Sequence, residues 1–157
     1  MNDSLIDTDT GRPYWEGLAE GELRYQRCGS CGHAWLPPRE FCPECLGGES
    51  EWVAACGRGK LVSWVIFHVA YNTLVEDRVP YNVAIVELDE GPRMITNIVD
   101  CEADGLTIDA PVSLVLQKED QFTLARFSQV RTSDATAGDA GAFGRPGSLC
   151  ARDGDAN

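Results

Sequence analysis

Cys28-Gly29-Ser30-Cys31 and Cys42-Pro43-Glu44-Cys45 are the two segments that decide how the first third of this 157-residue chain folds. Each C-x-x-C pair can form a tight turn that directs two thiolates to one point, and ten residues separate the pairs. Two such turns complete a tetrahedral site of four sulfurs, the closed geometry that structural zinc prefers. We therefore predict one structural zinc ion bound by Cys28, Cys31, Cys42 and Cys45.

Other chemistry at these cysteines is weighed against zinc. A rubredoxin-like iron or an iron–sulfur cluster would use the same thiolates, although the paired turns favour a zinc ribbon. A thioredoxin-like redox pair needs a single C-x-x-C in a βαβ setting, which this sequence does not indicate. Four protein ligands leave no open position for water or substrate, so the metal is expected to stabilise the fold. Gly32 and Gly47-Gly48 are expected to permit the turn after each pair.

The sequence that follows the cysteines predicts a β-domain. Runs rich in β-branched and aromatic residues predict five strands, and a hairpin turn is expected at residues 89–92. These strands are predicted over residues 61–70, 83–88, 94–99, 112–116 and 122–127. Five strands without a long helix favour a small, partly open OB-fold barrel. Gly57 and Gly59 suit the bulge or tight bend that such a barrel needs.

The sequence before the cysteines predicts a short helix. Pro13 suits a helix start, and Tyr14, Trp15 and Leu18 fall on one helical face. These side chains must pack on the body of the protein or on another chain, so they are candidate partner-binding residues. The chain thus divides into a flexible N-terminus (1–12), a helix with a zinc ribbon (13–56), an OB-fold barrel (57–130) and a Gly/Ala/Asp-rich tail (131–157). A partner chain is the expected surface for ordering that tail.

The composition argues against several classes of protein. Asp and Glu number 25 against 13 Lys and Arg, a formal net charge of −12 that would repel a phosphate backbone. No apolar stretch approaches the ~20 residues that span a bilayer. The start of the chain does not read as a signal peptide, so we expect a cytoplasmic protein. The predicted fold class is mostly β: an N-terminal helix and a rubredoxin-like zinc ribbon, followed by a five-stranded OB-fold barrel.

The sequence offers no catalytic set. Its two histidines, His33 and His68, are expected on the ribbon surface and within a strand. Nothing resembles a serine nucleophile elbow or a phosphate loop. We therefore predict no catalytic residue and no catalysis by the chain alone.

The order of these features resembles a known family. The resemblance covers residues 13–130 and rests on Tyr14-Trp15, the two cysteine pairs, 57–64 and Pro80-Tyr81-Asn82-Val83-Ala84. It is to the zinc-ribbon and OB-fold proteins associated with acyl-CoA enzymes. That resemblance implies a non-catalytic subunit that binds a thiolase-fold catalytic chain, stabilises it and helps form the channel for a CoA thioester.

The resemblance also implies where CoA could meet this chain. The acidic chain should leave most CoA contacts to its partner, and Arg24, Arg27 and Arg39 near the ribbon are the candidates for the rest. Two alternatives remain: a single-stranded nucleic-acid-binding OB-fold module, which the charge disfavours, and a stand-alone acyl-CoA-binding protein.

Overall fold

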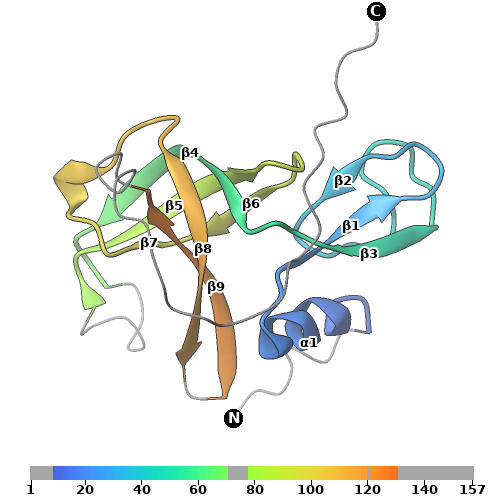
Figure 1. The fold of residues 1–157 in the computed structure, drawn as a ribbon, viewed down its shortest axis with the longest axis horizontal. Coiled ribbons are helices and arrows are strands. Elements are labelled where there is room, and N and C mark those ends of the chain that lie inside the picture. Colours follow the sequence, from blue (N-terminus) through green and yellow to red (C-terminus); the bar gives the residue numbers. More distant parts are fainter. Residues whose placement is uncertain (1–8, 71–77, 120, 131–157) are drawn as a thin grey trace, which may run out of the picture.

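The computed structural model describes residues 9–70, 78–119 and 121–130, and these ranges form one helix, a ribbon and a barrel (Figure 1). Most of the expected flexible N-terminus and the whole tail, with Cys150, lie outside the described residues. No helix in the described ranges is long and apolar enough to cross a membrane.

Helix α1 spans Arg12–Glu20, as the sequence predicts, and begins with a proline in its first turn. It ends at Gly21, whose φ of 93° belongs to the left-handed region that glycine adopts without steric cost. The amides of Gly21 and Glu22 donate to the carbonyls of Leu18 (3.2 Å) and Gly17 (2.7 Å), which satisfies the last turn. Leu18 is 1% exposed, so the helix is anchored by its own core-facing side chain.

The ribbon is a small antiparallel sheet with the order β2-β1-β3. Its strands are β1 (Arg24–Cys28), β2 (Ala34–Trp35) and β3 (Ser50–Ala54). In β1, Gln26 pairs with both Trp35 and Trp52, which places β1 at the centre of the sheet. The buried amide of Gln26 accepts from the Arg39 amide (2.7 Å) and donates to the Arg39 carbonyl (3.0 Å), which holds the cysteine loop against the sheet.

The barrel is a sheet with the order β6-β5-β4-β8-β9-β7. Its elements are β4 (Arg58–Phe67), β5 (Tyr81–Leu88), β6 (Arg93–Thr96), β7 (Ile98–Val99), the 3₁₀ turn η3 (Ala103–Gly105), β8 (Pro111–Glu119) and β9 (Phe122–Gln129). β6 and β7 are consecutive in the chain but lie at opposite ends of the sheet, so the sheet nearly returns on itself. This is the strand arrangement of an OB fold.

The single strand predicted over 94–99 is wrong in one respect, because the structure divides it at Asn97 into β6 and β7. Residues before Asn97 pair with β5, whereas residues after it pair in parallel with β9. The Asn97 carbonyl accepts from the Phe127 amide (3.1 Å), and the Thr96 hydroxyl donates to the Ala125 carbonyl (2.7 Å). A segment that pairs with β5 at one end of the sheet and with β9 near the other cannot continue as one straight strand.

The two glycines at the start of β4 differ in role, since Gly57 lies just before the strand and Gly59 lies within it. Gly57 has a φ of 77°, and the register of β4 on β5 shifts between Leu61 and Ser63, as in a β-bulge. A Cβ atom on Gly59 would overlap the Glu87 carbonyl oxygen and lie 3.1 Å from Leu88 Cα. The absence of a side chain at Gly59 therefore lets β4 approach β5 closely.

One hydrophobic core joins the helix to the barrel. It consists of Leu18, Leu23, Leu61, Ala84, Val86, Leu88, Met94, Ile98, Leu106, Val112 and Phe127. Leu18 comes from α1 and Leu23 from the segment before β1, so the N-terminal segment packs directly on the barrel.

Candidate metal centre

The first cysteine turn follows directly from β1. The Cys28 amide donates to the His33 carbonyl (2.8 Å), and the Gly32 amide donates to the Cys28 carbonyl (3.0 Å). Gly32 has a φ of 75°, so glycine suits the residue after the second cysteine of this pair. The Ser30 amide points at Cys28 Sγ (3.4 Å), an arrangement that stabilises a thiolate.

The second turn repeats the hydrogen bonds of the first. The Cys42 amide donates to the Gly47 carbonyl (2.9 Å), and the Leu46 amide donates to the Cys42 carbonyl (3.0 Å). The residue with positive φ is Leu46, at 61°, and neither Gly47 nor Gly48 has a positive φ. The expectation that Gly47-Gly48 would permit this turn is therefore wrong, because a leucine occupies the position equivalent to Gly32.

The two turns bring the four predicted ligands together. Their Sγ atoms all lie within 4.8 Å of one another. Cys28 and Cys45 are 3.5 Å apart at Sγ, and Cys31 and Cys42 are 3.6 Å apart. A zinc ion bound by four sulfurs at about 2.3 Å in a tetrahedron separates each pair of sulfurs by about 3.8 Å. The donor set and its spacing therefore fit a structural zinc ion.

Burial and electrostatics at the cluster also suit metal ligands. Cys28 and Cys42 are buried against Trp35, whereas Cys31 and Cys45 are exposed. The backbone amide of Cys31, followed by that of Ser30, lowers the pKa of Cys28 to about 6. The hydrogen bond from the His33 amide lowers the pKa of Cys31, but partial desolvation of its sulfur and the three neighbouring thiols outweigh it, and the pKa rises to about 12. Four thiolates need a cation between them, which is what the bound metal would supply.

The three candidate CoA-binding arginines do not form one patch. Arg24 and Arg27 lie three positions apart on β1, so their side chains leave opposite faces of the strand. Arg24 is paired with Glu20 (2.5 Å) and Glu22 (3.1 Å). Arg27 donates to the Tyr25 hydroxyl (2.8 Å), and the Arg39 side chain is exposed. Arg27 and Arg39 are thus more available to a ligand than Arg24.

The candidate partner-binding residues on α1 pack largely within this chain. Leu18 belongs to the core, and Tyr14 and Trp15 are half-buried against it. Trp15 also lies 6.2 Å from the Phe122 ring of β9. Burial raises the pKa of Tyr14 to about 12. The exposed parts of Tyr14 and Trp15 remain candidates for partner contact.

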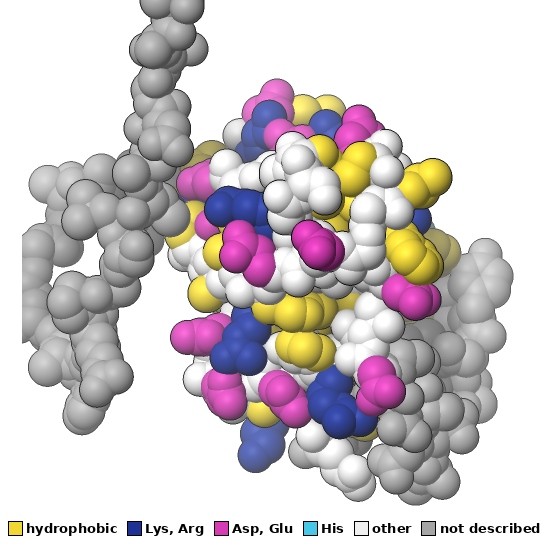
Figure 2. All heavy atoms as spheres, turned by 90° about the vertical axis from the view of Figure 1, so that its right-hand side faces the viewer, with side chains coloured by type: hydrophobic (Ala, Val, Ile, Leu, Met, Phe, Trp, Pro, Cys, Tyr) yellow, Lys and Arg dark blue, Asp and Glu magenta, His cyan; other side chains and the backbone are white. Residues whose placement is uncertain are grey.

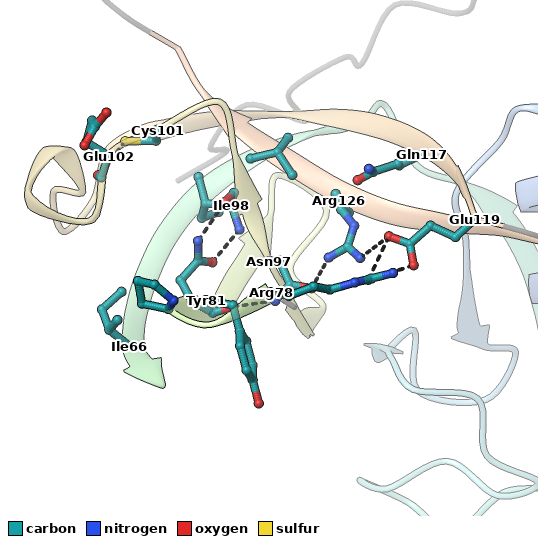
Figure 3. Close-up of a pocket in the computed structure, with 13 residues that line it drawn as sticks. Ile66, Arg78, Tyr81, Asn97, Ile98, Cys101, Glu102, Gln117, Glu119 and Arg126 are labelled. Atoms are coloured by element: carbon teal, nitrogen blue, oxygen red, sulfur yellow. Dashed lines mark hydrogen bonds and ion pairs between the residues drawn. The ribbon is translucent and has the colours of Figure 1, made fainter. Parts of the chain in front are cut away.

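A second candidate site is a polar pocket of about 880 Å³ in the barrel wall, between β5, β7 and the β8–β9 hairpin. Figure 3 shows Arg78, Asn97 and Arg126 converging on this pocket, with Glu119 between the two arginines. Glu119 accepts from Arg126 (2.7 Å) and from Arg78 (2.9 Å), and these contacts lower its pKa, the bond from Arg126 contributing most. The side-chain amide of Asn82 donates to the Ile98 carbonyl and accepts from the Ile98 amide (2.7 Å each).

Most polar groups of this pocket are therefore hydrogen-bonded to other groups of the same pocket. Asn97 joins the Asn82 carbonyl to the Arg126 guanidinium. Among the described residues that line this pocket, Arg126 Nε is the buried side-chain atom left without a hydrogen bond. The network ties β5, β7 and β9 together where the open sheet nearly returns on itself. Sequence reasoning missed it, although Asn is depleted in strands and Asn82 and Asn97 both lie in strand-like runs.

The two histidines lie outside the cysteine cluster. The His33 ring stacks on Trp35 with centroids 6.2 Å apart, and His68 is exposed just beyond β4.

Fold and site together define a zinc-ribbon protein with a C-terminal OB-fold barrel.

Comparison with known families gives the same two parts. Residues 15–51 match the family described as "ChsH2, rubredoxin-like zinc ribbon domain", and residues 52–117 match "ChsH2, C-terminal OB-fold domain". A DUF35 domain-containing scaffold protein of Methanothermobacter thermautotrophicus is 35% identical over 112 residues, which cover 71% of this chain and 84% of that protein. A homologous scaffold protein of Methanocaldococcus jannaschii is 39% identical over 93 residues, 59% of this chain, and the match spans 65% of its own length. The chain belongs to the DUF35 family.

Two further relatives carry functional names. The benzoylsuccinyl-CoA thiolase subunit BbsA of Geobacter metallireducens is 30% identical over 111 residues, covering 71% of this chain and 67% of that subunit. A chain of the solved structure titled "Ltp2-ChsH2(DUF35) aldolase" is 32% identical, with a TM-score of 0.70 over 78% of this chain and 95% of that chain.

Proposed function

We propose that this chain is a non-catalytic, zinc-binding subunit of a heteromeric thiolase-type enzyme, a thiolase or aldolase acting on an acyl-CoA thioester. It stabilises the catalytic subunit and helps to form the CoA and substrate channel. The observation that carries the proposal is the likeness to the DUF35 chain of the aldolase structure, which this chain matches over almost that chain's full length.

The geometry of this chain supports an accessory role. The four cysteines fit a metal that has no open position, so the metal would hold the ribbon together and would not bind substrate. The polar side chains that line the pocket in the barrel are mainly hydrogen-bonded to one another. The reacting groups are therefore expected on the partner.

Native mass spectrometry of the protein purified from its own cells tests this proposal, with zinc measured on the same sample. We expect a heteromer that contains a chain of thiolase size, with one zinc ion per small subunit. Activity toward a CoA thioester should appear in the heteromer and be absent from the isolated small subunit. A zinc-loaded protein that co-purifies with no such chain would contradict the proposal.

A further inference from the structure

Two hydrophobic side chains stand exposed at the end of the ribbon, beside the second cysteine pair. We define the ribbon tip as residues 40–49, which include this pair. Within the tip, Phe41 is 51% exposed and Leu46 is 75% exposed. The Phe41 ring lies over Gly48, so the aromatic side chain is held in place on the loop while half of it faces solvent.

Leu46 is not explained by the conformation or the packing of this chain. Its φ of 61° lies in the left-handed region, where a leucine is strained, and the equivalent residue of the first turn is Gly32 with a φ of 75°. The Gly32 turn shows that glycine makes the same hydrogen bond from the same position. A leucine that is strained and exposed has no role within the described fold, and strain of this kind accumulates where a contact outside the chain uses the residue.

The ribbon tip is also acidic. It contains Glu40, Glu44 and Glu49, all exposed, and no Lys or Arg, and the exposed Arg39 directly precedes it. Four thiolates outweigh the two positive charges of a zinc ion, so a filled metal site would add to this negative charge. Figure 2 shows the face of the molecule at this end, where acidic and basic side chains both lie around exposed hydrophobic ones.

We infer that the ribbon tip inserts Phe41 and Leu46 into a hydrophobic pocket bordered by Lys and Arg side chains on the catalytic subunit. This inference rests on the proposed function and adds the docking surface. The charge selects the partner: two ribbon tips would repel each other, and the three glutamates would repel phosphates of nucleic acid or anionic lipid. A hydrophobic pocket with a basic border satisfies both the side chains and the charges of the tip.

The test measures the affinity of this chain for the catalytic chain that co-purifies with it. Leu46→Gly and Phe41→Ser should each raise Kd about tenfold or more, as expected for hydrophobic anchors at the centre of an interface. Leu46→Gly should leave the Tm of the isolated chain unchanged or higher, because glycine relieves the positive φ. Ile108→Ser is the matched control, since Ile108 is 62% exposed in the loop between η3 and β8 of the barrel and is not part of the tip.

Charge reversal provides a second arm. Glu44→Lys should weaken the complex and reduce the salt dependence of its association, whereas Glu102→Lys, at an exposed acidic position beside η3, should change neither.

Three outcomes would overturn the inference. If Leu46→Gly and Phe41→Ser bind as tightly as the wild type while Ile108→Ser releases the partner, the docking surface lies on the barrel and the proposed function stands. If the isolated chain self-associates and Leu46→Gly abolishes that association, the tip is a contact between copies. If no thiolase-sized chain co-purifies, the proposed function fails, and the docking inference fails with it.

Discussion

Single glycines decide how closely the strands of the barrel approach one another. At Gly59 the backbone of β4 lies against the Glu87 carbonyl and Leu88 Cα, with no room for a Cβ atom. The overlap is with backbone atoms of β5, which cannot rotate away as the end of a long side chain can. Close packing makes even one added methyl group costly at such a position.

Gly59→Ala should therefore destabilise the protein by about 2 kcal/mol or more, the cost of overpacking against a fixed backbone. Urea unfolding followed by circular dichroism measures the change. Gly29→Ala is the matched control, because a Cβ atom there would lie 3.8 Å from its nearest neighbours, an ordinary van der Waals contact. Equal stabilities of the two variants would show that β4 and β5 can separate without cost.

At the scale of elements, the ribbon depends on its metal far more than the barrel does. The core of the ribbon around the cluster consists of Cys28, Trp35 and Cys42, whereas the barrel has a separate and larger hydrophobic cluster. Structural zinc sites in small modules contribute about 10–16 kcal/mol at pH 7, so little else holds such a ribbon.

Removal of zinc with a chelator, or Cys42→Ser, should abolish amide protection over residues 24–54. Protection should persist over β4 and β5, because their core does not include the cysteines. Hydrogen exchange with mass spectrometry measures both regions in one experiment, and metal analysis confirms the loss of zinc. Retained protection over 24–54 in the metal-free protein would contradict a structural role for the metal.

The carboxylate of Glu119 joins the β8–β9 hairpin to the segment before β5, because it accepts from both Arg126 and Arg78. Arg126 and then Arg78 lower its pKa from the ordinary value of 4.5. A depressed pKa means that Glu119 stabilises the fold above about pH 4.5, and that this contribution disappears as the pH falls through the folded-state pKa. The side chains of Glu119 and Arg126 are 24% and 12% exposed, so the pair is only partly screened by water.

Glu119→Gln should lower the free energy of unfolding at pH 7 by about 2 kcal/mol, because a hydrogen bond to a mostly buried charge is lost. The deficit relative to wild type should shrink below about pH 4.5. Glu87→Gln is the matched control. Its partners Lys60 and Arg93 are 49% and 63% exposed, so water screens these ion pairs and their loss should cost less than the loss of the Glu119 pairs. A pH-independent deficit in the Glu119 variant would show that its charge is not involved.

Sequence alone predicts the elements whose signals are local. The cysteine spacing locates the four clustered thiols, and the β-branched runs locate the barrel strands. The break at Asn97 is not predictable in this way, because it arises from pairing with two strands that are distant in sequence. The conformation of Leu46 is likewise hidden, since a nearby Gly47 offers the obvious but unused residue for a positive φ.

At the scale of the whole molecule, the acidic charge of −12 makes isolated arginines conspicuous. Arg27 lies in β1 of the ribbon and Arg39 is exposed in the cysteine loop, and neither has a carboxylate partner among the described residues, whereas Arg24 is held by Glu20 and Glu22. We propose that Arg27 and Arg39 contact the phosphates of CoA in the assembled enzyme, where the partner supplies the remaining contacts.

Arg27→Glu and Arg39→Glu should each raise the KM of the complex for its CoA thioester about fivefold, equivalent to about 1 kcal/mol of lost interaction. Arg12→Glu is the control, because Arg12 is exposed at the start of α1 and a carboxylate there suits the helix terminus. Steady-state kinetics of the reconstituted complex measures the change. Unchanged KM values in both ribbon variants would exclude these arginines from the CoA site.

The short link between ribbon and barrel has a mechanical consequence. β3 ends at Ala54 and β4 begins at Arg58, and the amide of Cys56 between them donates to Glu90 Oε1 (2.6 Å) in the β5–β6 hairpin. The amide of Ala55 is held as well, by the Leu23 carbonyl (2.7 Å). These two hydrogen bonds restrict movement of the ribbon relative to the barrel. A partner that touches both the ribbon tip and the barrel must therefore present its two contact points at one fixed spacing.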